Sequence, residues 1–329
     1  MHYTDEMLLR WLYAGVLFLM GLAVGSFLNV VAYRVPMGVS LLHPPSSCPS
    51  CGKNILARDN LPLFGWLLLR GKCRSCQQPI SVRYPLVELA TGILWGLVGW
   101  RLGATHLGYW NNVFVGLLGL AFVSAMVITF LVDMDYLIIL DEVSMGGTAV
   151  ALIVSALFPF LHQAATPGQF AFHHSLLNHV VGGMAPWVCG LSVAAVGMIT
   201  GIAFALVIYY VGNATFREQI EAAREEDPEV DSALGLGDVK LMAFFGALMG
   251  WQAVFFVFLT GSALAAIYGT IRKLGTGDPG DAKGMEALRR RWETGSSLMP
   301  FGPFLVLGAL GFFFLGDEIR LWVANNMAL

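Results

Sequence analysis

Long apolar segments alternate with shorter polar ones along the whole chain. A run of about 20 apolar residues crosses a hydrocarbon core about 30 Å thick. Helices are implied because lipid offers no partner to backbone polar groups, and the runs lack the alternation of barrel strands. We therefore expect eight transmembrane helices, although the fifth segment is long for one straight span and the sixth is short; the segments lie near 11–32, 86–102, 111–132, 143–161, 179–212, 239–252, 253–271 and 299–324.

The composition agrees with a membrane protein. The 329 residues are 57% apolar and only 12% charged, whereas a soluble domain carries about 25% charged residues. The net charge of −3 gives no sign of a nucleic-acid face, so we expect membrane lipid as a partner and no nucleic acid. Asp5 and Glu6 precede the first apolar run, which lacks a small-residue cleavage site, so this run is predicted to be a permanent anchor.

The distribution of basic residues orients the predicted helices. With the N-terminus outside, the inside loops would be 33–85, 133–142, 213–238 and 272–298. Counting Lys240 with the third loop, the inside then holds 16 of the 19 Lys and Arg residues, as the positive-inside rule requires. The opposite orientation would invert that ratio.

Four of the five cysteines form two Cys-x-x-Cys pairs inside the loop 33–85. Cys48 and Cys51 are separated by 21 residues from Cys73 and Cys76, one residue more than is usual for zinc ribbons. Four thiolates can close a tetrahedron around zinc, and two disulfides are a poor alternative in a reducing cytoplasm. We predict a small zinc-ribbon-like module with a structural zinc site, and an ordinary buried residue at Cys189.

Acidic residues follow two of the apolar runs. Asp133 and Asp135 end the third run, and Asp238 follows Gly235 and Gly237 just before the sixth. A carboxylate beside a membrane span is costly and suggests a functional site, while the glycines allow another backbone to approach closely.

The predicted topology puts Asp133 and Asp238 at the same face of the membrane, so the two can meet. Two nearby carboxylates do not both ionise easily, so one can activate water while the other donates a proton to a scissile carbonyl. Two simpler alternatives remain open for these residues: helix caps at a wet interface, for which Asp238 is well placed, and ion or proton pathway residues. No His-x-x-x-His helix, G-x-S-x-G elbow or phosphate loop competes with them.

The chain resembles the type IV prepilin peptidases, bacterial membrane aspartyl proteases of the GxGD class. The resemblance rests on GSFLNVVAYRVP at 25–36, on the two cysteine pairs followed by SVRYPLVEL at 81–89, and on three further motifs. These motifs are FLVDMDYLIILD at 130–141, GLGDVKLMAFFGALMG at 235–250 and MPFGPFLVLG at 299–308.

The resemblance implies specific roles for residues of this chain. Asp133 and Asp238 match the catalytic aspartates, and Asp135, Gly235, Gly237, Lys240 and Asp141 are expected to support them. Cys48, Cys51, Cys73 and Cys76 match the zinc ligands. Members with this cysteine loop cut a basic leader from prepilins and pseudopilins at the cytoplasmic edge of the bacterial inner membrane. They then methylate the new N-terminus with S-adenosylmethionine, an activity tied to the first cytoplasmic loop; no residue is assigned to bind this cofactor.

The resemblance also suggests a domain division: 1–32 is the first transmembrane helix, 33–85 the zinc-binding loop and 86–329 the protease. Leu140 stands where the family usually has proline. The gap between the two aspartates is lengthened by two stretches, a histidine-bearing loop at 162–178 and an acidic insert at 217–231. The insert either attracts a basic leader or is a solvated linker. The rival functions are a peptidase without methylation and a proton- or ion-coupled transporter that uses the same aspartates.

Overall fold

The structure is a computed structural model that describes residues 2–102, 109–165, 175, 185–226, 232–275 and 300–326. Over these residues the chain is helical, with two isolated β-bridges and no strand. The main helices are α1 (His2–Arg34), α3 (Arg83–Leu102), α4 (Tyr109–Tyr136), α5 (Asp141–Leu157), α8 (Pro186–Thr215), α10 (Leu236–Met249), α11 (Trp251–Gly275) and α13 (Gly302–Asn326), and the short ones are η1 (Ala57–Asp59), α2 (Phe64–Leu68), α6 (Phe160–Ala165) and α9 (Arg217–Glu226).

Each of the eight predicted apolar segments coincides with one of the main helices. Among the described residues, four helices have the length and apolar composition to cross a membrane: Met7–Arg34, Val113–Tyr136, Pro186–Thr215 and Trp251–Ile271. Gly302–Gly316 is a shorter apolar helix. The prediction of an all-helical, multi-pass membrane protein is therefore confirmed. The count of eight spans stays a prediction.

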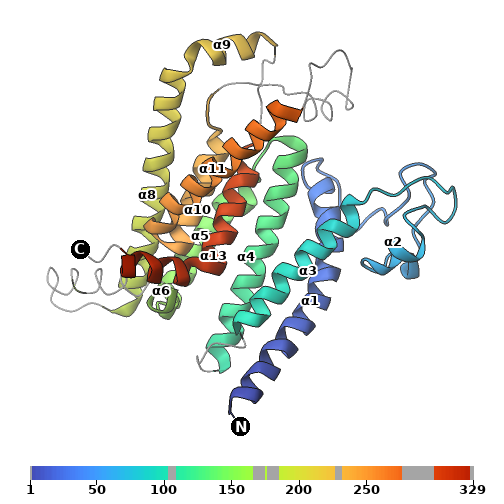
Figure 1. Cartoon of the computed structure of the whole chain (residues 1–329), viewed down its shortest axis with the longest axis horizontal. Helices are drawn as coiled ribbons and strands as arrows, with labels where there is room; N and C mark the ends of the chain where they lie inside the picture. Colours follow the sequence, from blue (N-terminus) through green and yellow to red (C-terminus); the bar gives the residue numbers. More distant parts are fainter. Residues whose placement is uncertain are drawn as a thin grey trace. The chain divides into compact units, whose positions relative to one another are not determined.

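The chain divides into two compact units, Met1–Val132 and Asp133–Leu329. In the first unit, α1 and α3 pack side by side along their length (Figure 1). Glycines make this close approach possible: a Cβ atom on Gly21 would lie 2.9 Å from the Cα of Gly92, and one on Gly25 would lie 2.8 Å from the Cα of Glu88. Both helices carry a Gly-x-x-x-Gly pair, which brings helix backbones together in lipid.

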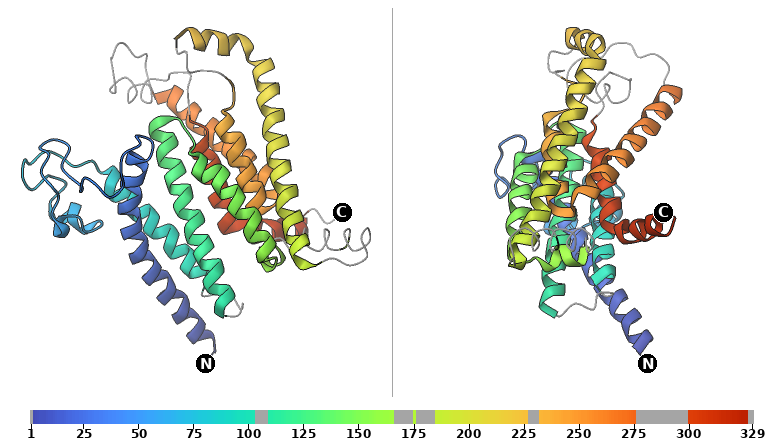
Figure 2. Two further views of the ribbon diagram at one scale, coloured as in Figure 1. Left: turned by 180° about the vertical axis from the view of Figure 1, so that it is seen from behind. Right: turned by 90° about the vertical axis from the view of Figure 1, so that its left-hand side faces the viewer.

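In the second unit, α10 contacts α5, α8, α11 and α13, and Figure 2 shows it among these helices from two sides. Its side chains are buried nearly all round, with Leu241, Met242 and Phe245 almost fully enclosed. A Cβ atom on Gly197 of α8 would overlap the carbonyl oxygen of Gly246. The helix that carries Asp238 is therefore held in the interior of this unit by close backbone packing.

Two predicted boundaries need correction, and the acidic insert contains a helix. The inside loop expected at 133–142 is much shorter, because α4 continues through Asp133 and Asp135 to Tyr136. The sixth apolar helix begins at Leu236 rather than at 239. The first ten residues of the acidic insert form α9, where Arg217 pairs with Glu221 one helical turn away at 2.9 Å; such pairs support solvated helices. His173 and His174 lie outside the described residues.

Candidate active site and metal centre

The structure brings Asp133 and Asp238 together within the second unit. Asp133 lies in the last turn of α4 and Asp238 in the first turn of α10, and their side chains interact electrostatically. Both residues are buried, at 5% and 7% exposure. Two acidic residues 105 positions apart in the sequence thus share one enclosed site, a meeting that the predicted topology allowed.

Backbone N–H groups at two helix starts stabilise these carboxylates. The N–H of Gly302, the first residue of α13, donates a hydrogen bond to Asp133, and the N–H of Gly235 donates to Asp238. Gly235 is the N-cap residue of α10, so the third helical residue reaches back to the cap, as acidic residues do in a capping box. Asp238 therefore does help to cap α10, but as the third residue of the helix and not as the residue that precedes it.

Three small or apolar contacts close the space around the carboxylates. A Cβ atom on Gly302 would lie 3.1 Å from Asp133 Cγ and closer still to Oδ2, and also 3.4 Å from Ile139 Cδ1. A Cβ atom on Gly237 would lie 3.1 Å from Ile139 Cβ. Ile139 thus lies near both glycines: a side chain at position 237 would press on Ile139, whereas one at position 302 would press on the Asp133 carboxylate.

Neither Gly302 nor Ile139 was a predicted site residue. Gly302 belongs to the MPFGPFLVLG motif, for which no role was predicted, and a glycine beside Pro303 at the start of an apolar run is the signal that was available. Ile139 belongs to the apolar YLIIL run after Asp135, and nothing in its residue type distinguishes it from its neighbours.

The residues predicted to support the two aspartates include Lys240, Asp141 and Asp135. The Lys240 ammonium, one turn after the start of α10, lies 2.6 Å from Asp141 Oδ1 in the first turn of α5. This ion pair joins the start of α10 to the start of α5. Asp135 is half-buried at the end of α4, and the role predicted for it stays a prediction.

The four cysteines gather as predicted, in the first unit. Their sulfur atoms all lie within 4.8 Å of one another, and Cys48 Sγ is 3.8 Å from Cys76 Sγ. A tetrahedral zinc site with Zn–S bonds of about 2.3 Å places its sulfurs about 3.8 Å apart, whereas a disulfide needs about 2.05 Å. The donor set and spacing fit one metal ion with four thiolate ligands. Cys189 is buried in α8, as expected.

The two cysteine pairs adopt the same turn. The N–H of Gly52 donates to the carbonyl of Cys48 and the N–H of Gln77 to the carbonyl of Cys73, at 2.8 and 3.0 Å. Gly52 and Gln77 occupy equivalent positions with φ of 69° and 60°. The second turn therefore holds a non-glycine residue in the left-handed region, which costs about 1 kcal/mol or more.

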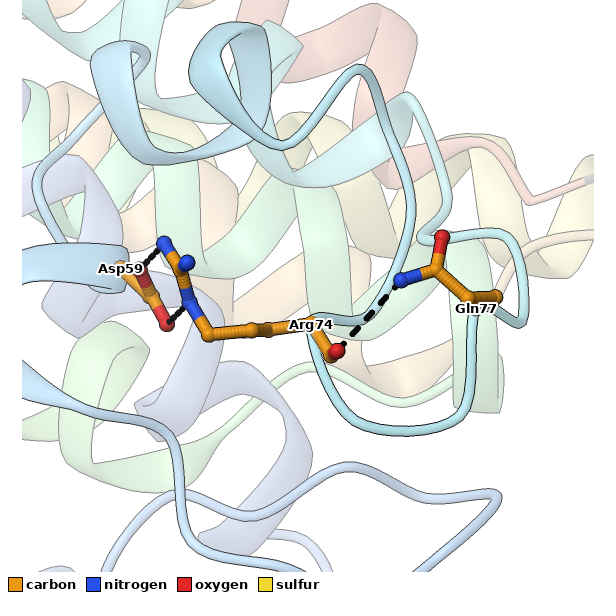
Figure 3. A network of polar contacts seen from close by, with 3 residues as sticks. All are labelled: Asp59, Arg74 and Gln77. Carbon is orange, nitrogen blue, oxygen red and sulfur yellow. Dashed lines mark hydrogen bonds and ion pairs between the residues drawn. The ribbon is translucent and has the colours of Figure 1, made fainter.

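An ion pair joins the second turn to the rest of the module (Figure 3). Arg74 Nε and Nη2 donate to the two carboxylate oxygens of Asp59 at 2.7 and 2.6 Å, and Gln77 Nε2 donates to the Arg74 carbonyl at 3.4 Å. The Arg74 guanidinium lowers the pKa of Asp59 below its usual value. The segment between Cys73 and Cys76 is thereby fixed to η1.

The local electrostatics of the four thiols favour a bound cation. Backbone N–H groups of Cys51 and Ser50 lower the pKa of the Cys48 thiol to about 6. The N–H of Gln78 acts in the same direction on Cys76, but burial and the neighbouring thiols outweigh it and raise the pKa of Cys76 to about 11. Four thiolates this close repel one another, so a cation is needed for all four to ionise together.

Comparison with known proteins places this architecture in a family. Residues 19–102 match the family model of the bacterial peptidase A24 N-terminal domain, and residues 120–270 match that of the type IV leader peptidase family. The chain belongs to the type IV leader peptidase family.

Individual relatives agree with that assignment. The prepilin leader peptidase/N-methyltransferase of Aeromonas hydrophila is 30% identical over 97% of this chain and 96% of its own length. Proteins of the same name from Klebsiella pneumoniae and Myxococcus xanthus are 36% and 35% identical, over 74% and 82% of this chain and 88% and 66% of their own lengths. No solved structure matches the chain.

Proposed function

We propose that this protein removes the leader peptide from type IV prepilins and pseudopilins and then methylates the new N-terminal residue. The family membership and the name shared by its relatives support both activities. The observation that carries the peptidase assignment is the enclosed pair of carboxylates on α4 and α10, one of them in the Gly-x-Gly-Asp sequence at 235–238.

The proposed hydrolysis uses Asp133 and Asp238 as one unit. One carboxylate takes a proton from water, which attacks the scissile carbonyl carbon, while the other, protonated, donates its proton to the carbonyl oxygen. When the tetrahedral species collapses, the C–N bond breaks, the carboxyl that took the water's proton gives it to the leaving amine, and the other carboxylate recovers its proton from the hydroxyl group of the tetrahedral species. The N–H groups of Gly302 and Gly235 hold the two carboxylates in place throughout, and Lys240 and Asp135 are proposed to support them.

The cysteine module is proposed to hold zinc through Cys48, Cys51, Cys73 and Cys76. A site with four thiolate ligands is coordinatively closed, so its metal would stabilise the loop fold rather than take part in hydrolysis. The methyl donor implied by an N-methyltransferase of this family is S-adenosylmethionine.

The proposed location is the bacterial inner membrane, with the aspartates at its cytoplasmic edge. The distribution of Lys and Arg supports this orientation. A proton- or ion-coupled transporter built on the same aspartates receives no support from the family or from the relatives.

The test is to incubate a prepilin in lipid with wild type, Asp133→Asn and Asp238→Asn protein and to sequence the product's N-terminus. Both variants should lose cleavage, because an amide can neither accept the proton from water nor exchange it. Glu142→Gln, an exposed acidic residue of α5, is the matched control and should cleave normally. Normal processing by Asp238→Asn would favour the transporter, and cleavage without incorporation of labelled methyl groups would select a peptidase without methylation.

A further inference from the structure

The short helix α2 of the cysteine module presents an apolar face outward. Phe64, Leu67 and Leu68 are 58%, 60% and 76% exposed, and their i, i+3, i+4 spacing puts them on one side of the helix. The opposite side faces the module: Gly65 is buried, and Trp66 Nε1 donates to the Ile80 carbonyl at 3.0 Å. If water surrounded the module, these apolar side chains would be expected to face its interior.

The surroundings of this face are strongly basic. Residues 33–85 contain seven Lys and Arg residues and a single acidic residue, Asp59, whose carboxylate is occupied by Arg74. Exposed Arg58, Arg70 and Lys72 flank α2 in the sequence. An apolar helix face with a basic surround is typical of segments that lie in the interface of an anionic membrane.

A buried carboxylate fixes the position of α2 against α3. Glu88 lies buried on α3, and its Oε2 accepts a hydrogen bond of 2.7 Å from the N–H of Leu63, the N-cap residue of α2. Leu63 takes a φ of 58° there, a conformation that a leucine adopts only when its surroundings hold it.

The module folds back along the helices it joins. In Figure 1, α2 lies level with α3 and below the upper end of α1, and the left-hand view of Figure 2 shows the same levels from behind. In the predicted topology α1 and α3 both cross the membrane and meet the cytoplasm at Arg34 and Arg83, which would put this level at the lipid headgroups and the outer acyl chains.

We propose that α2 inserts the Phe64, Leu67 and Leu68 side chains into the cytoplasmic leaflet and that Arg58, Arg70 and Lys72 contact anionic headgroups around it. A second copy of the chain is a poorer occupant for this face, because two equally basic modules repel each other. Three side chains also fall well short of the surface of about 800 Å² per partner that a stable protein interface buries.

The test measures the depth of α2 in the full-length protein in nanodiscs. A ketone-bearing amino acid is introduced at Leu67, or at exposed Lys53 as the control, and is coupled to a spin label so that the four cysteines stay unmodified. Collision rates with oxygen, which concentrates in lipid, and with a nickel chelate, which stays in water, give the depth. Oxygen should dominate at 67 and nickel at 53.

Two other outcomes would overturn the proposal. Equal access of nickel to both positions would mean that α2 lies in water, and protection of position 67 from both reagents would mean that protein covers it. Adding anionic lipid to neutral nanodiscs should raise the oxygen-to-nickel ratio at 67 several-fold, and Arg70→Gln with Lys72→Gln should remove that increase. If the oxygen-to-nickel ratio at 67 is the same for both proteins in neutral and in anionic nanodiscs, the headgroup contacts are excluded.

Discussion

Gly302 offers the sharpest test of the geometry around Asp133. In Gly302→Ala the added methyl group would lie 3.1 Å from Asp133 Cγ, closer still to Oδ2 and 3.4 Å from Ile139 Cδ1, whereas ordinary Cβ contacts begin at 3.4 Å. The backbone N–H that binds Asp133 is retained, so the substitution changes only the space available to the carboxylate. The carboxylate has to move by up to about 1 Å.

A displacement of that size in a reacting group costs about 100-fold in rate, or about 2.7 kcal/mol in the activation barrier. We therefore expect Gly302→Ala to lower kcat/KM for prepilin cleavage about 100-fold, with a folded protein and an intact zinc content. The assay is a time course of leader removal from a purified prepilin in lipid.

The matched control is Gly311→Ala in the same helix, where the nearest atom to the new methyl group, Phe256 Cε1, lies 3.9 Å away. This variant should cleave as the wild type does. If Gly302→Ala also cleaves at the wild-type rate, then Asp133 does not work in the close contact with Gly302 that the structure shows.

Three further experiments test other parts of the structure. Gly201→Ala puts a methyl group onto the Met242 carbonyl. It should destabilise the packing of α8 on α10 by about 1–3 kcal/mol, which a lower Tm would show. The control Gly269→Ala adds a methyl group with no atom within 4 Å and should leave the Tm unchanged. Gln77→Gly relieves the left-handed φ of 60° and should slow zinc loss to a chelator, because the strain of about 1 kcal/mol is removed. A double-mutant cycle on Lys240→Met and Asp141→Asn should give a coupling of only about 0.2–1 kcal/mol in unfolding, since both side chains are partly exposed; a value near 3 kcal/mol would mean that the pair is desolvated.

The sequence predicted those features that depend on composition and local pattern. Apolar run lengths located the main helices, and the spacing of Cys48, Cys51, Cys73 and Cys76 predicted a cluster that the structure contains. That Asp133 and Asp238 lie at the same face of the membrane followed from counting spans, because two predicted crossings, 143–161 and 179–212, separate them in the sequence.

Other features depend on tertiary packing and left a weaker signal. The end of α4 was placed too early because an acidic residue reads as a loop, although a carboxylate with a backbone N–H partner such as Gly302 can remain in a buried helix. The close contact of α8 with α10 had a readable signal, the Gly-x-x-x-Gly pair Gly197 and Gly201, which stands in an apolar run of the kind where this spacing favours helix packing. The outward face of α2 had none, since FGWLL reads as an ordinary apolar core segment.

The capping and catalytic interpretations of Asp238 predict different results for two substitutions at the same position. Asparagine retains an oxygen that can accept the Gly235 N–H, and it removes the charge that interacts with Asp133, so Asp238→Asn should be at least as stable as the wild type. Alanine loses the acceptor and should be less stable than Asn by about 1 kcal/mol.

If Asp238 only caps α10, activity should follow stability: the Asn variant would cleave prepilin and the Ala variant would cleave it poorly. If Asp238 also exchanges a proton with substrate or water, both variants should be inactive although only one is destabilised. Thermal unfolding in lipid and a cleavage assay on the same two samples separate the cases, because helix capping needs only an oxygen acceptor at this position, whereas hydrolysis also needs a group that gains and loses a proton.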